Sequence, residues 1–210
     1  MVNINFWFSP GSCSLAPHVL LHAAQLPFTP HALSISRQGT QSDDFARINP
    51  KRRVPVLALD DEIITEVPAI AAAIAQLAPQ QGLMGKTPFD QLRVLEWMCW
   101  LSGELHGQCF GGLFRPERFI SDASQFGAIQ QKARERIADC FSAIENNVSS
   151  GFAVGDALTA VDPYLLVFYR WGSRNAFAMA ERYPRFTACI HGMVKHPAIV
   201  KAMADEGISL

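Results

Sequence analysis

The hydrophobic pattern of this 210-residue chain changes near residues 79–90, in the stretch PQQGLMGKTPFD. Before this stretch, short apolar runs alternate with glycine, proline and aspartate, which is typical of strands and turns. After residue 88, apolar side chains recur every three or four positions, which is typical of amphipathic helices. The sequence therefore predicts a strand-bearing layer followed by an all-helical part.

In the first part, strands and helices are expected to alternate. Residues 4–8 predict a buried strand that a Ser-Pro-Gly turn ends, and residues 15–26 have helical spacing. Residues 28–35 predict a weaker strand whose proline suits a sheet edge. Residues 54–65 predict two short strands, and the alanine-rich residues 67–78 predict a helix. This order predicts a small α/β layer structure.

In the second part, residues 126–148 predict a long amphipathic helix. Thr159 and Asp162 have the spacing of a capping box, in which Thr159 caps the helix and Asp162 reaches back. Pro184 and Pro197 predict the starts of two further helices. We expect an N-terminal domain, a linker and a helical domain, over residues 1–80, 81–89 and 90–210.

Composition excludes several classes of function. Hydrophobic residues make up 49% and charged residues 18%, which is typical of a globular protein. No run approaches the ~20 apolar residues that a membrane span needs, and no secretion signal is expected. A formal net charge of -1 favours neither nucleic acid nor an anionic membrane as a partner. We therefore expect a cytoplasmic protein.

The five cysteines are odd in number and widely spaced, which favours reduced thiols over a disulfide framework. Cys99, Cys109, Cys140 and Cys189 lie among apolar residues and are predicted to be small core hydrophobes. Cys13 differs, because it lies between a Pro-Gly turn and the start of a helix.

Two interpretations of Cys13 follow from the pattern. The free N–H groups at a helix start stabilise a thiolate, which lowers a cysteine pKa from about 8.5 to ~3.5–7.5. Pro10 and Gly11 would let the sulfur or another anion approach the backbone closely. Alternatively, Cys13 only packs while Ser12 or Ser14 caps the helix. The pattern alone supports the two interpretations equally.

Four stretches, in this order, resemble the glutathione transferases: SPGSCSLAPH, NPKRRVPVLALDDEIITEVPAI, SGELHGQCFGGLFRP and VGDALTAVDPYLLVFYRW. The first is similar to the bacterial beta class, and the resemblance runs from about Asn5 to Gly207. It implies a thioredoxin-like α/β N-terminal domain with an all-α C-terminal domain, a homodimer, and glutathione as co-substrate. No cluster of histidine and cysteine ligands points to a metal.

The resemblance implies where the γ-glutamyl and cysteinyl parts of glutathione bind. Val54 and Pro55 match the family's cis-proline, which exposes the Val54 backbone to the cysteinyl part. The Glu66 carboxylate suits the γ-glutamyl ammonium group, and the Val67 backbone N–H suits the carboxylate. Many relatives have serine or glycine in place of Val67, so a hydroxyl contact is absent. Without the resemblance, Glu66 is interpreted as a first-turn residue that favours the helix dipole.

Arginines are the candidates for the glycyl carboxylate. Arg37 lies roughly where beta-class members have a lysine, and Arg53 lies where many relatives have glutamine. Arg52 competes with both, and the choice among the three stays open.

At the sulfur end the sequence departs from the commonest transferase pattern. Phe8 occupies the place where many members have a tyrosine that holds the glutathione thiolate. Cys13 is therefore the leading candidate for the residue that acts at the glutathione sulfur, and the hydroxyls of Ser12 and Ser14 are the alternatives. His106 matches the histidine that faces the active-site cysteine from the helical domain.

The leading interpretation is conjugation of the glutathione thiolate to a hydrophobic electrophile. Phe110, Phe114 and Trp171 are candidate walls of the electrophile site, although such aromatics also suit an ordinary core. One alternative is a glutathione-dependent thiol–disulfide transferase that uses Cys13. Another is a non-catalytic binding or regulatory protein with a transferase fold.

Overall fold

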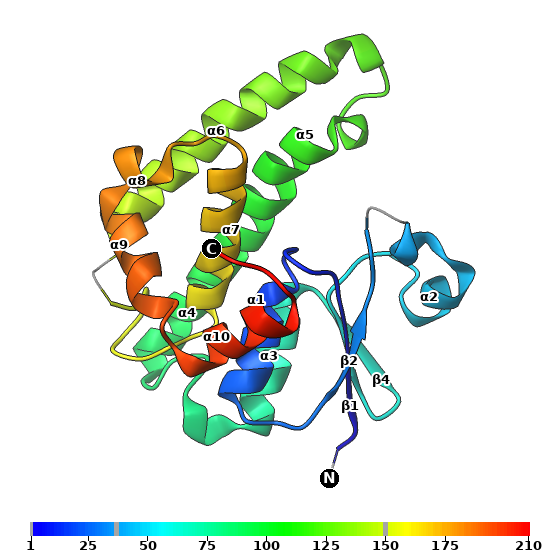
Figure 1. Ribbon diagram of the computed structural model, residues 1–210, viewed down its shortest axis with the longest axis vertical. Coiled ribbons are helices and arrows are strands. Elements are labelled where there is room, and N and C mark those ends of the chain that lie inside the picture. Colours follow the sequence, from blue (N-terminus) through cyan, green and yellow to red (C-terminus); the bar gives the residue numbers. More distant parts are fainter. Residues whose placement is uncertain (1, 36–37, 149–150) are drawn as a thin grey trace.

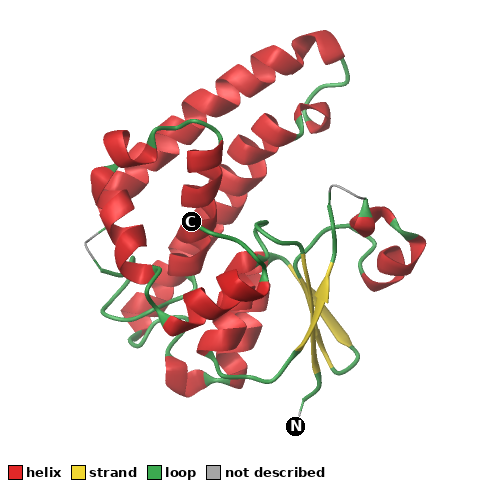
Figure 2. Cartoon of the chain, in the orientation of Figure 1, coloured by secondary structure: helices red, strands yellow, loops and turns green. Residues whose placement is uncertain are grey.

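The computed structural model describes residues 2–35, 38–148 and 151–210, and it places a small sheet beside a set of helices (Figure 1). The strands are β1 (Ile4–Phe8), β2 (Thr29–Ala32), β3 (Val56–Leu59) and β4 (Glu62–Thr65), and the helices among them are α1 (Leu15–Ala23), α2 (Asp43–Ile48) and α3 (Val67–Leu77). The helices that follow are α4 (Pro88–Trp100), α5 (Gly111–Phe114), α6 (Phe126–Asn147), α7 (Val161–Arg174), α8 (Met179–Arg182), α9 (Pro184–Met193) and α10 (Pro197–Asp205). Strands occur only in the first part of the described chain, as predicted (Figure 2).

The four-stranded sheet has the order β2-β1-β3-β4. Strand β1 runs parallel to β2 and antiparallel to β3, and β3 and β4 form a hairpin. Strand β2 is therefore an edge strand, which tolerates Pro30 because a proline cannot donate a ladder hydrogen bond. The predicted strands and the α/β layer are confirmed.

The two faces of the sheet carry different helices because side chains alternate along a strand. Phe6 and Phe8 belong to the main core, which α1 and α3 share. Trp7 points to the opposite face and packs with Val56 and with Phe45 of α2. This arrangement leaves the end of β1, and the loop that follows it, at the boundary with the helical part (Figure 1).

The helical part contains a feature that the sequence pattern did not predict. Helix α4 continues into α5 through a π-helical segment, Leu101–Phe110. An apolar period cannot separate a π-helix from an α-helix over so few turns, and π segments often occur at functional sites. Helix α7 is buried along nearly its whole length, and its core is continuous with that of the sheet.

The predicted capping box at the start of α7 is only half formed. The carboxylate of Asp162 accepts hydrogen bonds from the Thr159 N–H (2.7 Å) and the Ala153 N–H (2.8 Å). The Thr159 hydroxyl donates to the same carboxylate, at 3.1 Å, so it does not cap a backbone N–H. A complete capping box is found instead at Thr87 and Asp90, where α4 begins.

Four cysteines were predicted to be small core residues. This prediction is correct for Cys109, Cys140 and Cys189, which are buried, and wrong for Cys99. Cys99 is exposed because it lies on the outward face of α4.

The predicted helix starts at Pro184 and Pro197 are confirmed. None of the helices in the described ranges is long and apolar enough to cross a membrane. The division at residues 81–89 stays a prediction.

Candidate active site

A cavity of about 950 Å³ lies where the sheet part meets the helical part. Its lining includes every described residue that the sequence predicted for the site, namely Ser12, Cys13, Arg53, Val54, Pro55, Glu66, Val67 and His106. The competing Arg52 lines the cavity too, whereas Arg37 lies outside the described residues. The structure therefore brings together residues that are more than 90 positions apart in the sequence (Ser12 to His106).

The loop between β1 and α1 is held from the helical part. Gly11 has a φ of 73°, a conformation that favours glycine. Its N–H donates to the Glu206 carboxylate (2.7 Å), and its carbonyl accepts from the indole N–H of Trp171 (3.0 Å). Glu206 is itself bonded to Nδ1 of the buried His18 on α1, at 3.0 Å. Both backbone groups of Gly11 are thus satisfied, which fixes the loop that carries Cys13.

Serine hydroxyls complete the geometry of this loop. The Ser9 N–H donates to Oγ of Ser14 (3.1 Å), and the Ser14 hydroxyl donates to the Ser9 carbonyl (3.1 Å). The Oγ atoms of Ser12 and Ser14 are 2.7 Å apart and hydrogen-bonded. The Ser12 Oγ also accepts from the Ser14 N–H (3.2 Å) in the turn that leads into α1, whereas Ser14 makes no side-chain cap hydrogen bond, so a capping role is supported for Ser12 alone.

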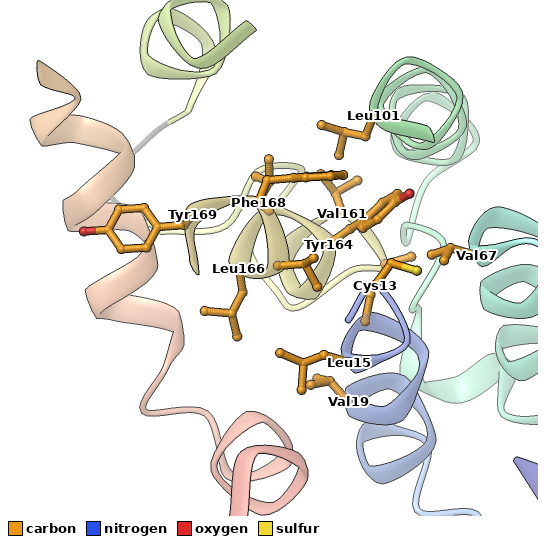
Figure 3. Packing of buried hydrophobic residues seen from close by; sticks show 14 of the residues in the cluster. Cys13, Leu15, Val19, Val67, Leu101, Val161, Tyr164, Leu166, Phe168 and Tyr169 are labelled. Carbon is orange, nitrogen blue, oxygen red and sulfur yellow. The ribbon is translucent and has the colours of Figure 1, made fainter. Parts of the chain in front are cut away.

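Cys13 lies at the start of α1, with Val67 and Tyr164 beside it (Figure 3). Its thiol is 7% exposed and points at the Val54 carbonyl, with an S···O distance of 3.6 Å. Burial raises the pKa of Cys13 to about 12, which outweighs the opposing effect of its own backbone N–H. Of the two interpretations of Cys13 that the sequence leaves open, the raised pKa favours the packed, neutral thiol in the ligand-free protein.

His106, on the π-helical segment, forms a neutral pair with Tyr164 of α7. The distance from His106 Nδ1 to the Tyr164 hydroxyl is 2.9 Å. Burial lowers the pKa of His106 to about 4 and raises the pKa of Tyr164 well above its ordinary value. Both groups are uncharged at neutral pH, so an N–H or O–H of this pair can donate a hydrogen bond to an anion without carrying a charge itself.

The sequence analysis missed Tyr164, although a signal was present. Tyr164 lies in the apolar run PYLLVFYRW, and a buried tyrosine needs a partner for its hydroxyl. Phe8 is 4% exposed and packs against the His18 ring (centroids 4.8 Å apart), away from the residues that line the cavity. A hydroxyl is thus absent from the end of β1, as predicted, and α7 supplies one instead.

The sheet side of the cavity is polar. The Val54–Pro55 peptide bond is cis, as the resemblance implies. Glu66 has a φ of 73°, and its carboxylate accepts from Nζ of Lys51 at 2.7 Å. Val67 begins α3, whose first N–H groups have no partners within the helix. The sequence did not point to Lys51, because only the fold brings the basic run PKRRVP against Glu66.

The helical side of the cavity is aromatic. The rings of Phe110 and Phe114 meet Trp171 edge to face, with centroids 5.1 and 5.5 Å apart. These predicted wall residues all line the cavity, and Phe114 remains 46% exposed. Arg115 and Arg118 extend this wall. The sequence analysis did not single them out, because nothing in a helical pattern shows which charged side chains face a cavity.

Comparisons with known proteins agree with this site. Residues 11–77 match the family described as "Glutathione S-transferase, N-terminal domain". Glutathione S-transferase GST-4.5 of Xanthomonas campestris is 28% identical over 98% of this chain and 100% of its own length. A sphingomonad glutathione S-transferase complexed with glutathione is 30% identical, with a TM-score of 0.81 over 98% of this chain and 100% of that one. A bacterial beta-class enzyme from Sphingomonas chungbukensis is 27% identical over 98% and 100% of the two chains, with a TM-score of 0.83.

The fold is thus a thioredoxin-like layer joined to an all-α part, with a thiol at the start of the first helix. The chain belongs to the glutathione S-transferase family. The match to a beta-class enzyme agrees with the resemblance of the stretch around Cys13.

Proposed function

We propose that this protein is a cytoplasmic, homodimeric glutathione S-transferase that joins the thiolate of glutathione to hydrophobic electrophiles. The observation that carries the proposal is a cavity whose lining combines the Cys13 thiol, a polar sheet side and an aromatic helical side. The polar sheet side suits a peptide with two carboxylates, and the aromatic helical side suits an apolar ring.

In this proposal glutathione lies along the sheet side. The Val54 backbone pairs with the cysteinyl part, and Glu66 holds the ammonium group. The N–H of Val67 and the ammonium of Lys51 receive the γ-glutamyl carboxylate, since an anion is favoured at a helix start. Ser12 lines the same cavity, and Arg52 and Arg53 are the described candidates for the glycyl carboxylate. Arg37 stays a candidate from the sequence alone.

Catalysis would come from hydrogen bonds to the glutathione thiolate and from proximity. A neutral thiol on Cys13 donates its S–H to the thiolate, which lowers the pKa of the glutathione sulfur. The Tyr164 hydroxyl is a second donor in the same cavity, and His106 positions it through their 2.9 Å hydrogen bond. Cys13 then acts as a donor, and the attacking nucleophile is glutathione itself.

The thiol–disulfide alternative requires Cys13 as a thiolate, because the thiolate is the nucleophile in exchange reactions. A Cys13 pKa raised to about 12 opposes this step, so the structure favours conjugation. The non-catalytic alternative predicts that glutathione does not bind.

Titration calorimetry with glutathione under reducing conditions tests the proposal. Wild type and Cys13→Ala should both bind in the micromolar to millimolar range, whereas Glu66→Gln should bind about tenfold more weakly because it loses a charged contact. The matched control is Glu96→Gln, which removes a carboxylate that is paired with Arg93 on α4. No binding by the wild type would contradict the enzymatic interpretations.

Two activity assays on the same proteins separate the two reactions. With 1-chloro-2,4-dinitrobenzene, Cys13→Ala should keep measurable conjugation. With a mixed disulfide, both proteins should be slow. If the wild type exchanges the disulfide rapidly and Cys13→Ala does not exchange it at all, the protein is a thiol transferase instead.

Exposed apolar side chains on α4 support the proposed homodimer. Phe89, Leu92 and Leu95 are 64%, 64% and 50% exposed, and Cys99 follows on the same helix. Burying such a patch between two copies would be favourable. Light scattering after size-exclusion chromatography should show a dimer for the wild type and a monomer for Leu92→Glu. A monomeric wild type would contradict this part of the proposal.

A further inference from the structure

We propose that the electrophile is an aromatic compound with an anionic group, most simply a carboxylate, which Arg115 and Arg118 bind. This inference rests on the proposed conjugation reaction and specifies its substrate class.

The cavity is far more cationic than the chain as a whole. Its described lining holds one carboxylate, that of Glu66, and five cationic side chains, whereas the whole chain has a net charge of -1. Lys51 is paired with Glu66, and Arg52 contacts Asp43. Among the cavity-lining arginines, those that have no ion pair within the described residues are Arg53, Arg115 and Arg118.

One turn presents two of these groups together. A 3-10 turn, Pro116–Arg118, follows α5, and the Arg118 N–H donates to the Arg115 carbonyl at 3.1 Å. Burial and the charges of Arg115 and Arg53 lower the pKa of Arg118, so both of these cations repel the Arg118 guanidinium. A bound anion would relieve this repulsion, and a guanidinium group suits a carboxylate because two N–H groups can bind it at once.

These arginines lie on the electrophile side of the cavity. Arg115 directly follows Phe114, whose half-exposed ring meets Trp171. An aromatic electrophile packed on this wall would place a ring substituent next to Arg115 and Arg118. Glutathione has two carboxylates, and the sheet side already offers Lys51 and Val67 for one and Arg53 for the other. The cations of the helical side therefore remain available for the second substrate.

The reaction needs no oxidant, reductant or further reactant. With a chlorinated aromatic substrate, the glutathione sulfur forms a bond to the ring carbon that bears chlorine. The carbon–chlorine bond breaks, chloride leaves with the electron pair, and the thiol proton passes to solvent. The anionic substituent is unchanged, so its effect is on binding and orientation.

The experiment compares two electrophiles that differ in this substituent alone: 4-chloro-3,5-dinitrobenzoate and its methyl ester. Each kcat/KM is divided by the rate constant of the uncatalysed reaction with glutathione. We expect the wild type to favour the carboxylate by about tenfold or more, as charge-assisted hydrogen bonds predict. Arg115→Gln and Arg118→Gln should each reduce this preference several-fold and leave the KM for glutathione nearly unchanged. Arg118→Lys should retain part of the preference.

Arg182→Gln is the matched control, because it removes one positive charge from an exposed position on α8, away from the cavity lining. It should leave the preference unchanged. Calorimetry with the two aryl-glutathione products gives a readout that does not depend on turnover, and the carboxylate product should bind more tightly than the ester product.

The outcomes separate the two proposals. Conjugation of both compounds with equal corrected efficiency would overturn the inference and leave the transferase function intact. A raised KM for glutathione in the arginine variants, with no change in preference, would overturn it as well and assign these residues to glutathione. If neither compound is conjugated and neither product binds, both the function and the inference fail.

Discussion

Alkylation of Cys13 tests the electrostatic reasoning on which the proposed mechanism depends. The glutathione-free protein is treated with iodoacetamide at pH 7.5 under reducing conditions. Only the thiolate reacts at a useful rate. Burial raises the Cys13 pKa from its ordinary 9.0 to about 12, a change that reduces the thiolate fraction at this pH by about 1000-fold. Cys13 should therefore react about 1000 times more slowly than a free cysteine, and its 7% exposure slows it further.

The pH dependence has a definite sign. Because the raised pKa favours the neutral thiol, the Cys13 rate should climb about tenfold for each pH unit from pH 7 to pH 11, with no plateau. The contribution of the buried thiol to the free energy of unfolding follows the same sign. It is complete below pH 9.0, the ordinary pKa, and is lost as the pH rises towards about 12.

Peptide mass spectrometry measures the rate for each cysteine separately. The exposed Cys99 in the same sample is an internal control for reagent activity, and the urea-unfolded protein gives the unburied rate of Cys13. A Cys13 rate within about tenfold of free cysteine at pH 7.5, or one that levels off below pH 8, would refute the neutral-thiol reasoning. Either result would revive the thiol–disulfide transferase interpretation.

Three further predictions concern single substitutions. Asp162→Asn should lower the free energy of unfolding by about 2–4 kcal/mol in a urea titration, because three donors point at its carboxylate and an amide N–H₂ would face one of them; a loss below about 1 kcal/mol would contradict this account. Gly172→Ala should lower the free energy of unfolding by about 1–3 kcal/mol in the same assay, since its Cβ would lie 2.6 Å from Met179 Sδ and 2.8 Å from the Phe141 ring. Gly127→Ala is the control, because its Cβ would have nothing within 4 Å. Tyr164→Phe should lower kcat/KM for conjugation about tenfold while the calorimetric Kd for glutathione stays within twofold, and an unchanged kcat/KM would remove Tyr164 from the mechanism.

Much of the architecture was predictable because it depends on local patterns. The nearly continuous apolar run over residues 4–8 indicates that both faces of β1 are covered, and Pro30 marks β2 as an edge strand. The spacing of apolar residues over 126–148 predicted α6 to within one residue at its end. The local pattern of residues gave a wrong prediction where neighbours in space decide whether a side chain is buried. Cys99 has an apolar sequence context, yet it faces outward because no other element of the described chain covers that side of α4.

The residues of the candidate site also fall into those that the sequence could predict and those that only the fold brings together. Short stretches of sequence were sufficient to select Cys13, Glu66 and His106, because the residue types and their order carry the resemblance. They could not show that Tyr164 belongs to this site, because Tyr164 lies 58 positions from His106 and meets it only when α7 packs against the π-helical segment. Nor could they show that Arg115 and Arg118 face the aromatic wall.

The sequence by itself therefore determined the strands, the longer amphipathic helices, the family and the chemical types present at the site. The tertiary structure alone decided the protonation state of those groups. A helix start favours a thiolate at Cys13, but the burial that α3, α7 and the Val54 loop impose on it is the larger effect, and it keeps the thiol neutral. Periodicity and residue type are properties of neighbours along the chain. Desolvation and charge are properties of neighbours in space, which a sequence pattern does not contain.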